Sequence, residues 1–314
     1  MLKHASGSFN YINEPIALSV LLISLTVVFL LIYLVGGNFL KQNASNCLSK
    51  TGGKVRCMKK SLRNSLKNKE LQVVYQPIVS LTSESISLES LVRWKYKDEW
   101  VPPIVFIPLI EDMGLIEELT RQVANKVMQD WNFWKDEIPQ LTHISLNISP
   151  LMLQSNEPSS FLEELLEELE TRRINPKQIC LEITENVLLD HRSLKFIEDC
   201  TINGLLIAID DFGTGYSSMS YIANYPFDVL KIDRSFVEQI EKNRKQQEVA
   251  YAIVQLAKRL DIQVVAEGVE TEEQLNILRL MGTDAVQGYY FSKPQFVNEW
   301  NPYHLNKKLS LLRV

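Results

Sequence analysis

Residues 206–211, Leu-Ile-Ala-Ile-Asp-Asp, form the stretch that decides the fold, because they read as a short apolar strand ending in two adjacent carboxylates. The chain continues as Phe-Gly-Thr-Gly-Tyr-Ser-Ser, a composition typical of a loop. Neighbouring acids at a strand end repel each other, and a divalent cation bound through oxygen ligands compensates this repulsion. The stretch therefore predicts a metal site at a strand end.

The same pattern recurs along the chain. Apolar runs at 86–88, 144–146 and 179–181 deliver three further oxygen donors, which are Glu89, Asn147 and Glu182. Runs of this kind end near Ser80, Trp94, Ile148, Thr184, Asp211, Asp233, Gly268 and Tyr290. Amphipathic helices are predicted between them at 115–135, 161–173, 193–202, 246–260 and 271–281. Strands alternating with helices predict a (β/α)₈ barrel with its catalytic groups at the carboxyl ends of the strands.

Composition and charge narrow the functional classes. The chain has 314 residues, of which 46% are hydrophobic and 23% charged, as in a globular protein with a substantial core. The net charge of −5 gives no sign of a nucleic-acid-binding surface, so we expect no DNA or RNA partner. The four cysteines lack metal-ligand spacing and the four histidines form no cluster, which leaves the acidic residues as the candidate metal ligands.

The N-terminal part of the chain differs in kind. Residues 16–40 contain no charged side chain and approach the roughly 20 apolar residues that span a bilayer. A signal peptide is the alternative, but its apolar core is only about 7–15 residues long and no cleavage site follows here. Nine basic residues lie between 41 and 69, against only Lys3 before the stretch, which predicts a cytoplasmic location for the rest of the chain. The predicted organisation is a periplasmic stub (1–15), a transmembrane helix (16–40), a basic linker (41–68) and a catalytic domain (69–314).

Eight motifs in order carry a specific resemblance. They are YQPIV at 75–79, ESLVRW at 89–94, NIS at 147–149, EITE at 182–185, DDFGTGY at 210–216, KID at 231–233, AEGVE at 266–270 and QGY at 287–289. This series, spanning roughly residues 65–300, resembles the EAL-domain family of cyclic di-GMP phosphodiesterases. The resemblance implies the EAL type of TIM-like barrel. Ser90 departs from the family pattern, which has alanine there, and we expect little effect unless its hydroxyl disturbs Glu89.

The resemblance also implies a metal centre. By analogy with the family, Glu89, Asn147, Glu182 and Asp210 bind one cation, and Asp210 bridges to a second that Asp211 also holds. The implied cofactors are two Mg²⁺ or Mn²⁺ ions. Two such ions polarise a phosphodiester and make a bound water nucleophilic at neutral pH.

The remaining site residues follow from the same resemblance. Lys231 is implied to contact the attacking water or a phosphate oxygen, and Glu267 to act as general base or as an outer partner of the metals. Glu185 is implied to anchor the loop that begins at Phe212. Four residues are implied to hold or place the substrate: Gln76, Arg93, Asp233 and Gln287.

The function implied is hydrolysis of cyclic di-GMP to linear pGpG at the bacterial inner membrane, with consequences for biofilm formation and motility. The resemblance further implies a homodimer formed through the EAL domain. Two alternatives belong to other classes. A non-catalytic cyclic di-GMP receptor would lack metal ligands, whereas a barrel enzyme acting on carbanions would place a Lys or His base opposite the metal.

Overall fold

The computed structural model describes residues 53, 55–154, 158–185, 187, 191–214, 222 and 224–312. The chain divides into two compact units, residues 1–60 and residues 61–314, and the second contains all of the strands named below. No helix within the described residues has the length and apolar character needed to cross a membrane. The predicted transmembrane segment at 16–40 lies outside the described residues, as does the predicted stub at 1–15.

Residues 61–314 form a closed barrel of eight strands. Strand β1 pairs with both β2 and β9, and this closes the ring in the order β1-β9-β8-β7-β6-β5-β4-β2. The short strand β3 extends β2 as a hairpin outside the ring. The strands are β1 (Gln72–Ser80), β2 (Ile86–Tyr96), β3 (Glu99–Val101), β4 (Leu141–Ile148), β5 (Ile179–Thr184), β6 (Leu206–Phe212), β7 (Val229–Ile232), β8 (Gln263–Ala266) and β9 (Ala285–Gln287).

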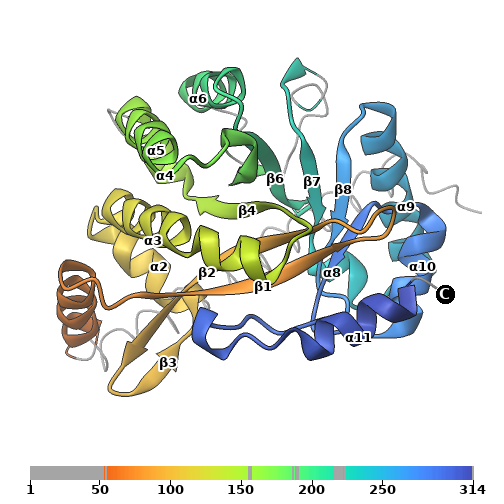
Figure 1. Ribbon diagram of the computed structural model, residues 1–314, viewed down its shortest axis with the longest axis horizontal. Coiled ribbons are helices and arrows are strands. Elements are labelled where there is room, and N and C mark those ends of the chain that lie inside the picture. The colour runs from red at the N-terminus through yellow and green to blue at the C-terminus, as the bar shows by residue number, and fades with distance from the viewer. Residues whose placement is uncertain are drawn as a thin grey trace, which may run out of the picture. The chain divides into compact units, whose positions relative to one another are not determined.

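Helices follow most strands, and the five predicted from sequence are present. In Figure 1, α5 and α6 lie on one side of the strands, and α9 and α10 lie on the other. Helix α10 is bounded as its sequence predicts, because Thr271 caps its start and Gly282 ends it in the left-handed region at φ 85°. The helices are α2 (Pro103–Asp112), α3 (Ile116–Glu137), α4 (Pro150–Leu153), α5 (Pro158–Arg172), α6 (His191–Ile202), α8 (Arg234–Val237), α9 (Arg244–Arg259), α10 (Glu272–Met281), α11 (Pro302–Leu312), and the 3₁₀ turns η1 (Pro176–Gln178) and η3 (Val297–Glu299).

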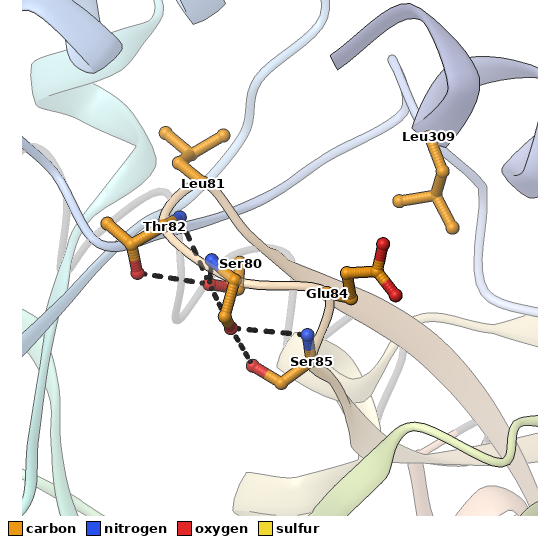
Figure 2. A pocket seen from close by; sticks show the side chains of 7 residues that line it. Ser80, Leu81, Thr82, Glu84, Ser85 and Leu309 are labelled. Atoms are coloured by element: carbon orange, nitrogen blue, oxygen red, sulfur yellow. Dashed lines mark hydrogen bonds between the residues drawn. The ribbon is translucent and has the colours of Figure 1, made fainter. Parts of the chain in front are cut away.

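The predicted eight-stranded barrel is confirmed, but strict alternation of strand and helix is wrong for the first two strands. Strands β1 and β2 are antiparallel and are joined by a turn at 81–85, which is too short for the crossover that parallel neighbours need. Figure 2 shows this turn together with Leu309 of α11, which lines the same cavity of about 260 Å³. Within the turn, the Ser80 hydroxyl accepts hydrogen bonds from the backbone N–H groups of Thr82 and Ser83. Strand β9 also ends at Gln287, three residues before the predicted Tyr290.

The barrel interior is apolar at one end and polar at the other. Side chains from six strands fill the apolar end: Ile78, Cys180, Ala208, Val229, Val265 and Ala285. Because strands β2 and β4 to β9 run parallel to one another, their carboxyl ends meet at the opposite end of this core. That end holds the acidic residues predicted from the sequence.

Candidate active site

A single buried lysine occupies the centre of the carboxyl end of the barrel. Lys231 of β7 has 1% of its surface exposed, so its ammonium group depends on protein partners. Its Nζ lies 2.7 Å from Glu267 Oε1, 2.8 Å from Glu182 Oε2, 3.1 Å from Asp210 Oδ1 and 3.7 Å from Glu89 Oε2. These carboxylates come from β2, β5, β6 and the residue after β8, so the ring gathers side chains that are up to 178 positions apart.

The ring carries more negative than positive charge. Burial alone lowers the pKa of Lys231, but the four carboxylates outweigh burial and raise this pKa well above its usual value. Burial also raises the pKa of Glu182 well above its ordinary value, and it raises that of Glu267 to about 8 despite the opposing effect of Lys231. For Glu89 the ammonium of Lys231 and hydrogen bonds overcome burial, so its pKa is lowered. One ammonium cannot neutralise four carboxylates, and the site therefore favours protons or further cations.

A local distortion of β6 brings the two adjacent acids together. In a regular strand, consecutive side chains point to opposite faces. The register of β6 against β7 shifts between Ile209 and Phe212, and Asp211 adopts the left-handed region at φ 53°. As a result, carboxylate oxygens of Asp210, Asp211 and Glu267 all lie within 4.8 Å of one another. Burial, followed by the charges of Asp210 and Asp233, raises the pKa of Asp211 to about 6.

Two amide side chains hold Glu89 in place. Asn147 Nδ2 donates to Glu89 Oε1 at 3.0 Å, and Gln287 Nε2 donates to Glu89 Oε2 at 2.6 Å. Gln287 Nε2 also lies 3.1 Å from Gln76 Oε1, and Gln76 Nε2 donates to the backbone oxygen of Ser292. Gln76 and Gln287, predicted to hold substrate, thus orient a predicted metal ligand in this structure.

Glu185 contacts the first residues of the loop after β6, the segment that it is predicted to anchor. Its Oε2 accepts a hydrogen bond from the backbone N–H of Gly213 at 3.1 Å. Gly213 has φ 95°, and a Cβ there would lie 2.9 Å from the ring of Phe236. The position therefore requires glycine, and Glu185 fixes the backbone two residues after Asp211. Residues 215–221 of this loop lie outside the described part of the chain.

Two predicted substrate-binding residues make their hydrogen bonds to backbone groups and not to the carboxylate ring. Asp233 accepts from the backbone N–H of Ser235 and caps the start of α8. Arg93 lies four residues after Glu89 on β2 and donates to the backbone oxygen of Val92 at 2.9 Å. Burial lowers the pKa of Arg93, while Glu89 and Tyr289 oppose this effect, so the guanidinium senses the charge of the ring.

Ser90, the departure from the family motif, faces away from the ring. Its buried hydroxyl donates to the backbone oxygen of Ser145 on β4 at 2.6 Å. Since its neighbour Glu89 points to the opposite face of the same strand, the hydroxyl has a partner and does not compete for the carboxylate.

A cavity of about 240 Å³ opens above the ring and reaches residues that the motifs did not single out. Arg234 and Glu270 at its wall form an ion pair at 2.9 Å, and half-exposed Tyr289 also lines it. Gly288 lies beside them, where an added Cβ would be 2.0 Å from the backbone oxygen of Val269. Glu270 and Tyr289 lie within the motifs at 266–270 and 287–289, but no role was predicted for either residue from the sequence.

A second cavity, of about 390 Å³, adjoins the ring between β2, β4, α2 and α3. Its lining includes the polar residues Glu89 and Asn147 and apolar side chains such as Ile107, Ile116 and Leu119. A ligand that carries both a charged and an apolar part would find complementary surfaces in the two cavities.

Comparison with known proteins decides the family. The protein-family model described as "EAL domain" matches residues 59–294, which is most of the chain. The chain belongs to the EAL-domain family. Its carboxylate ring is built from Glu89, the first residue of the Glu-Ser-Leu sequence at 89–91, and from acidic residues at later strand ends.

Relatives and solved structures give the EAL assignment its context. The probable cyclic di-GMP phosphodiesterase PdeB of Escherichia coli is 39% identical over 74% of this chain and 44% of that protein. The cyclic di-GMP phosphodiesterase NbdA of Pseudomonas aeruginosa is 36% identical over 76% of this chain and 30% of that protein. The chain thus spans less than half the length of either relative. A solved structure named "PaMucR Phosphodiesterase, c-di-GMP complex" aligns with a TM-score of 0.71 and 31% identity over 76% of this chain and 97% of that chain.

Proposed function

We propose that this EAL protein is a membrane-anchored phosphodiesterase that hydrolyses cyclic di-GMP to linear pGpG, using two Mg²⁺ or Mn²⁺ ions. The observation that carries the proposal is the ring of four carboxylates around Lys231, at the carboxyl end of an EAL-family barrel. Relatives named cyclic di-GMP phosphodiesterases support the choice of substrate.

The side chains present fit divalent cations. Asp210 Oδ1 is buried without a hydrogen-bond partner, although it lies 3.1 Å from Lys231 Nζ, and the ring has a surplus of negative charge. Glu89, Asn147, Glu182 and Asp210 would hold one ion, and Asp210 and Asp211 the second. When bound, such ions polarise a phosphodiester and lower the pKa of a coordinated water. The amide of Asn147 supplies an oxygen without further charge, which favours an anionic substrate.

The chain's own residues perform the remaining tasks. The ammonium of Lys231 would stabilise negative charge that builds on the phosphate oxygens in the transition state. Glu267, whose side chain is 18% exposed toward the cavity, would in its carboxylate form accept a proton from the attacking water. Gln76 and Gln287 keep Glu89 oriented, and Glu185 keeps the backbone after Asp211 in place. The Arg93 guanidinium would contact a phosphate of the substrate.

Location and assembly complete the proposal. We propose a single-pass anchor at 16–40 in the bacterial inner membrane with the barrel on the cytoplasmic side, supported by the uncharged stretch and the basic residues after it. A homodimer formed through the barrel is proposed by analogy with the family.

A non-catalytic receptor for cyclic di-GMP is the alternative function. It would bind the dinucleotide without cleaving it, and it would not need the metal ligands. All five side chains proposed to hold metal are present in this sequence, which favours the enzyme.

The test is a hydrolysis assay of the full chain in phospholipid nanodiscs with cyclic di-GMP, comparing Mg²⁺, Mn²⁺ and chelator, and resolving pGpG by chromatography. We expect metal-dependent pGpG that Glu89→Ala abolishes. Glu248→Ala is the matched control, because Glu248 is exposed and forms its ion pair within the described residues with Arg244, at 3.7 Å. A chain that binds cyclic di-GMP but yields no pGpG would support the receptor.

A further inference from the structure

The helix at residues 55–67 has two chemically different faces. Leu62 and Leu66 are 0% and 2% exposed, and Ser65 between them is also buried. The spacing of these residues is that of one helical face packed on a protein surface.

Contacts fix the second half of this helix on the barrel. Trp94 Nε1 of β2 donates to Ser65 Oγ at 3.2 Å, and Gln122 Nε2 of α3 donates to the backbone oxygen of Leu66 at 2.8 Å. Residues 61–67 are therefore held by a strand and a helix of the domain, and a force on this segment acts on the barrel.

The opposite face of the helix is a basic stripe, defined by Arg56, Lys60, Arg63 and Lys67. All four side chains are exposed, and their spacing of four, three and four residues places them within an arc of about 60°. In the part of the chain that the structure describes, none of the four forms a salt bridge. The sequence contains no acid between Lys41 and Lys69.

The charge of the rest of the chain limits what this stripe can face. Nine basic residues lie between 41 and 69, so removing their +9 from the total of −5 leaves −14 for all other residues. An anionic surface would repel most of the molecule and attract this stripe, which selects one orientation. Only 15 residues, 41–55, separate the uncharged stretch at 16–40 from Arg56, the first residue of the stripe, and this favours a bilayer over a soluble polyanion.

We propose that the basic stripe binds the headgroups of anionic lipids and so holds the barrel against the membrane surface in a fixed orientation. The proposal rests on the proposed membrane anchor and is independent of phosphodiester hydrolysis. Because the stripe belongs to a helix that is docked on β2 and α3, lipid binding orients the barrel and does not merely tether it.

The test uses the exposed thiol of Cys57, which is on the same helix, as a reporter of contact with headgroups. The full chain carries Cys47→Ser, while Cys180 and Cys200 are buried. The rate at which an uncharged, water-soluble maleimide alkylates Cys57 is measured in nanodiscs of phosphatidylcholine, with and without phosphatidylglycerol. We expect phosphatidylglycerol to slow alkylation on the order of tenfold, and high salt to reverse this effect.

Matched variants identify the stripe as the cause. Replacing Arg56, Lys60, Arg63 and Lys67 by Gln should abolish the lipid dependence. Replacing four exposed basic residues elsewhere, Lys242, Arg244, Lys245 and Lys258, by Gln should leave it intact. Thermal unfolding of both variants confirms that each is folded.

Several outcomes would overturn the proposal. Equal alkylation rates in the two lipids would do so, as would an unchanged lipid effect in the stripe variant or its loss in the control variant. Equal protection by soluble glycerol phosphate, or by double-stranded DNA, in phosphatidylcholine discs would identify a general anion site. A chain that fails to insert into phosphatidylcholine discs would refute the anchor alone, and co-sedimentation of the same variants with phosphatidylglycerol vesicles would then test the stripe.

Discussion

Replacing Lys231 by Met should destabilise the domain strongly, because it leaves the carboxylate ring without its ammonium. Four carboxylate oxygens lie between 2.7 and 3.7 Å from Nζ, and the lysine is 1% exposed. Removing one partner of a buried ion pair costs about 3–5 kcal/mol, since the remaining charge is uncompensated. We expect a loss in this range for the metal-free protein at pH 7.

The same reasoning predicts how the loss depends on conditions. At pH 5 the acids of the ring bind protons more readily, so the variant should lose less stability than at pH 7. Arg172→Met is the control, because Arg172 pairs with Glu168 at 2.6 Å on the solvent-facing side of α5 and such pairs contribute about 0.5 kcal/mol. Urea unfolding followed by circular dichroism measures both variants. A loss below about 1 kcal/mol for Lys231→Met, or one independent of pH, would refute the view that the ring depends on this ammonium.

Three further predictions concern Glu267, Gly288 and Ser90. The pKa of Glu267 is about 8 in the folded state, against an ordinary value of 4.5. Between pH 4.5 and pH 8 the metal-free folded protein therefore holds a proton that the unfolded chain has released. The free energy of unfolding should fall as pH rises through this window. Glu267→Gln should flatten that dependence in thermal unfolding, and an unchanged slope would contradict the assignment. Gly288→Ala should lower the free energy of unfolding in urea by at least about 3 kcal/mol, because its Cβ would collide with the backbone of Val269. Gly114→Ala is the control: Gly114 has φ 66° and open space around it, so the loss should be about 1 kcal/mol. Equal losses for the two variants would count against the collision. Ser90→Ala should cost about 1 kcal/mol of stability and leave hydrolysis within about twofold, and a large loss of activity would show that the hydroxyl influences Glu89.

The strand ends of this protein can be predicted from its sequence, because the barrel buries both faces of its strands and the strands are therefore apolar runs that end at polar residues. Glu89, Glu182 and Lys231 each stand at a polar position near the end of an apolar run, and the structure brings their charged atoms together. The hairpin of β1 and β2 was also readable, since residues 81–85 are too few for a helical crossover, but the periodic pattern of the later strands favoured regular alternation.

Contacts between residues that are far apart in the sequence could not be predicted in this way. Nothing local to Gln287 indicates that its amide is shared between Glu89 and Gln76, because these residues are about 200 positions away and meet only when β1 closes the ring. The central position of Lys231 has the same origin. A single lysine in a strand is ordinarily solvated, and only the closed barrel surrounds it with acids.

The backbone of Asp211 shows how the chemistry of the site constrains the fold. Its φ of 53° is a conformation that costs a residue other than glycine of order 1 kcal/mol, although aspartate tolerates it better than most. Glycine would relieve this cost but would bring no carboxylate, and a regular strand would turn the carboxylate away from Asp210. Since the oxygens of Asp210, Asp211 and Glu267 lie within 4.8 Å of one another, the distortion adds to a repulsion that the apo fold must already oppose. Both costs fall on the same few residues, and divalent cations bound between the carboxylates would offset the repulsion, so the proposed metal site, and not folding, accounts for aspartate at this position.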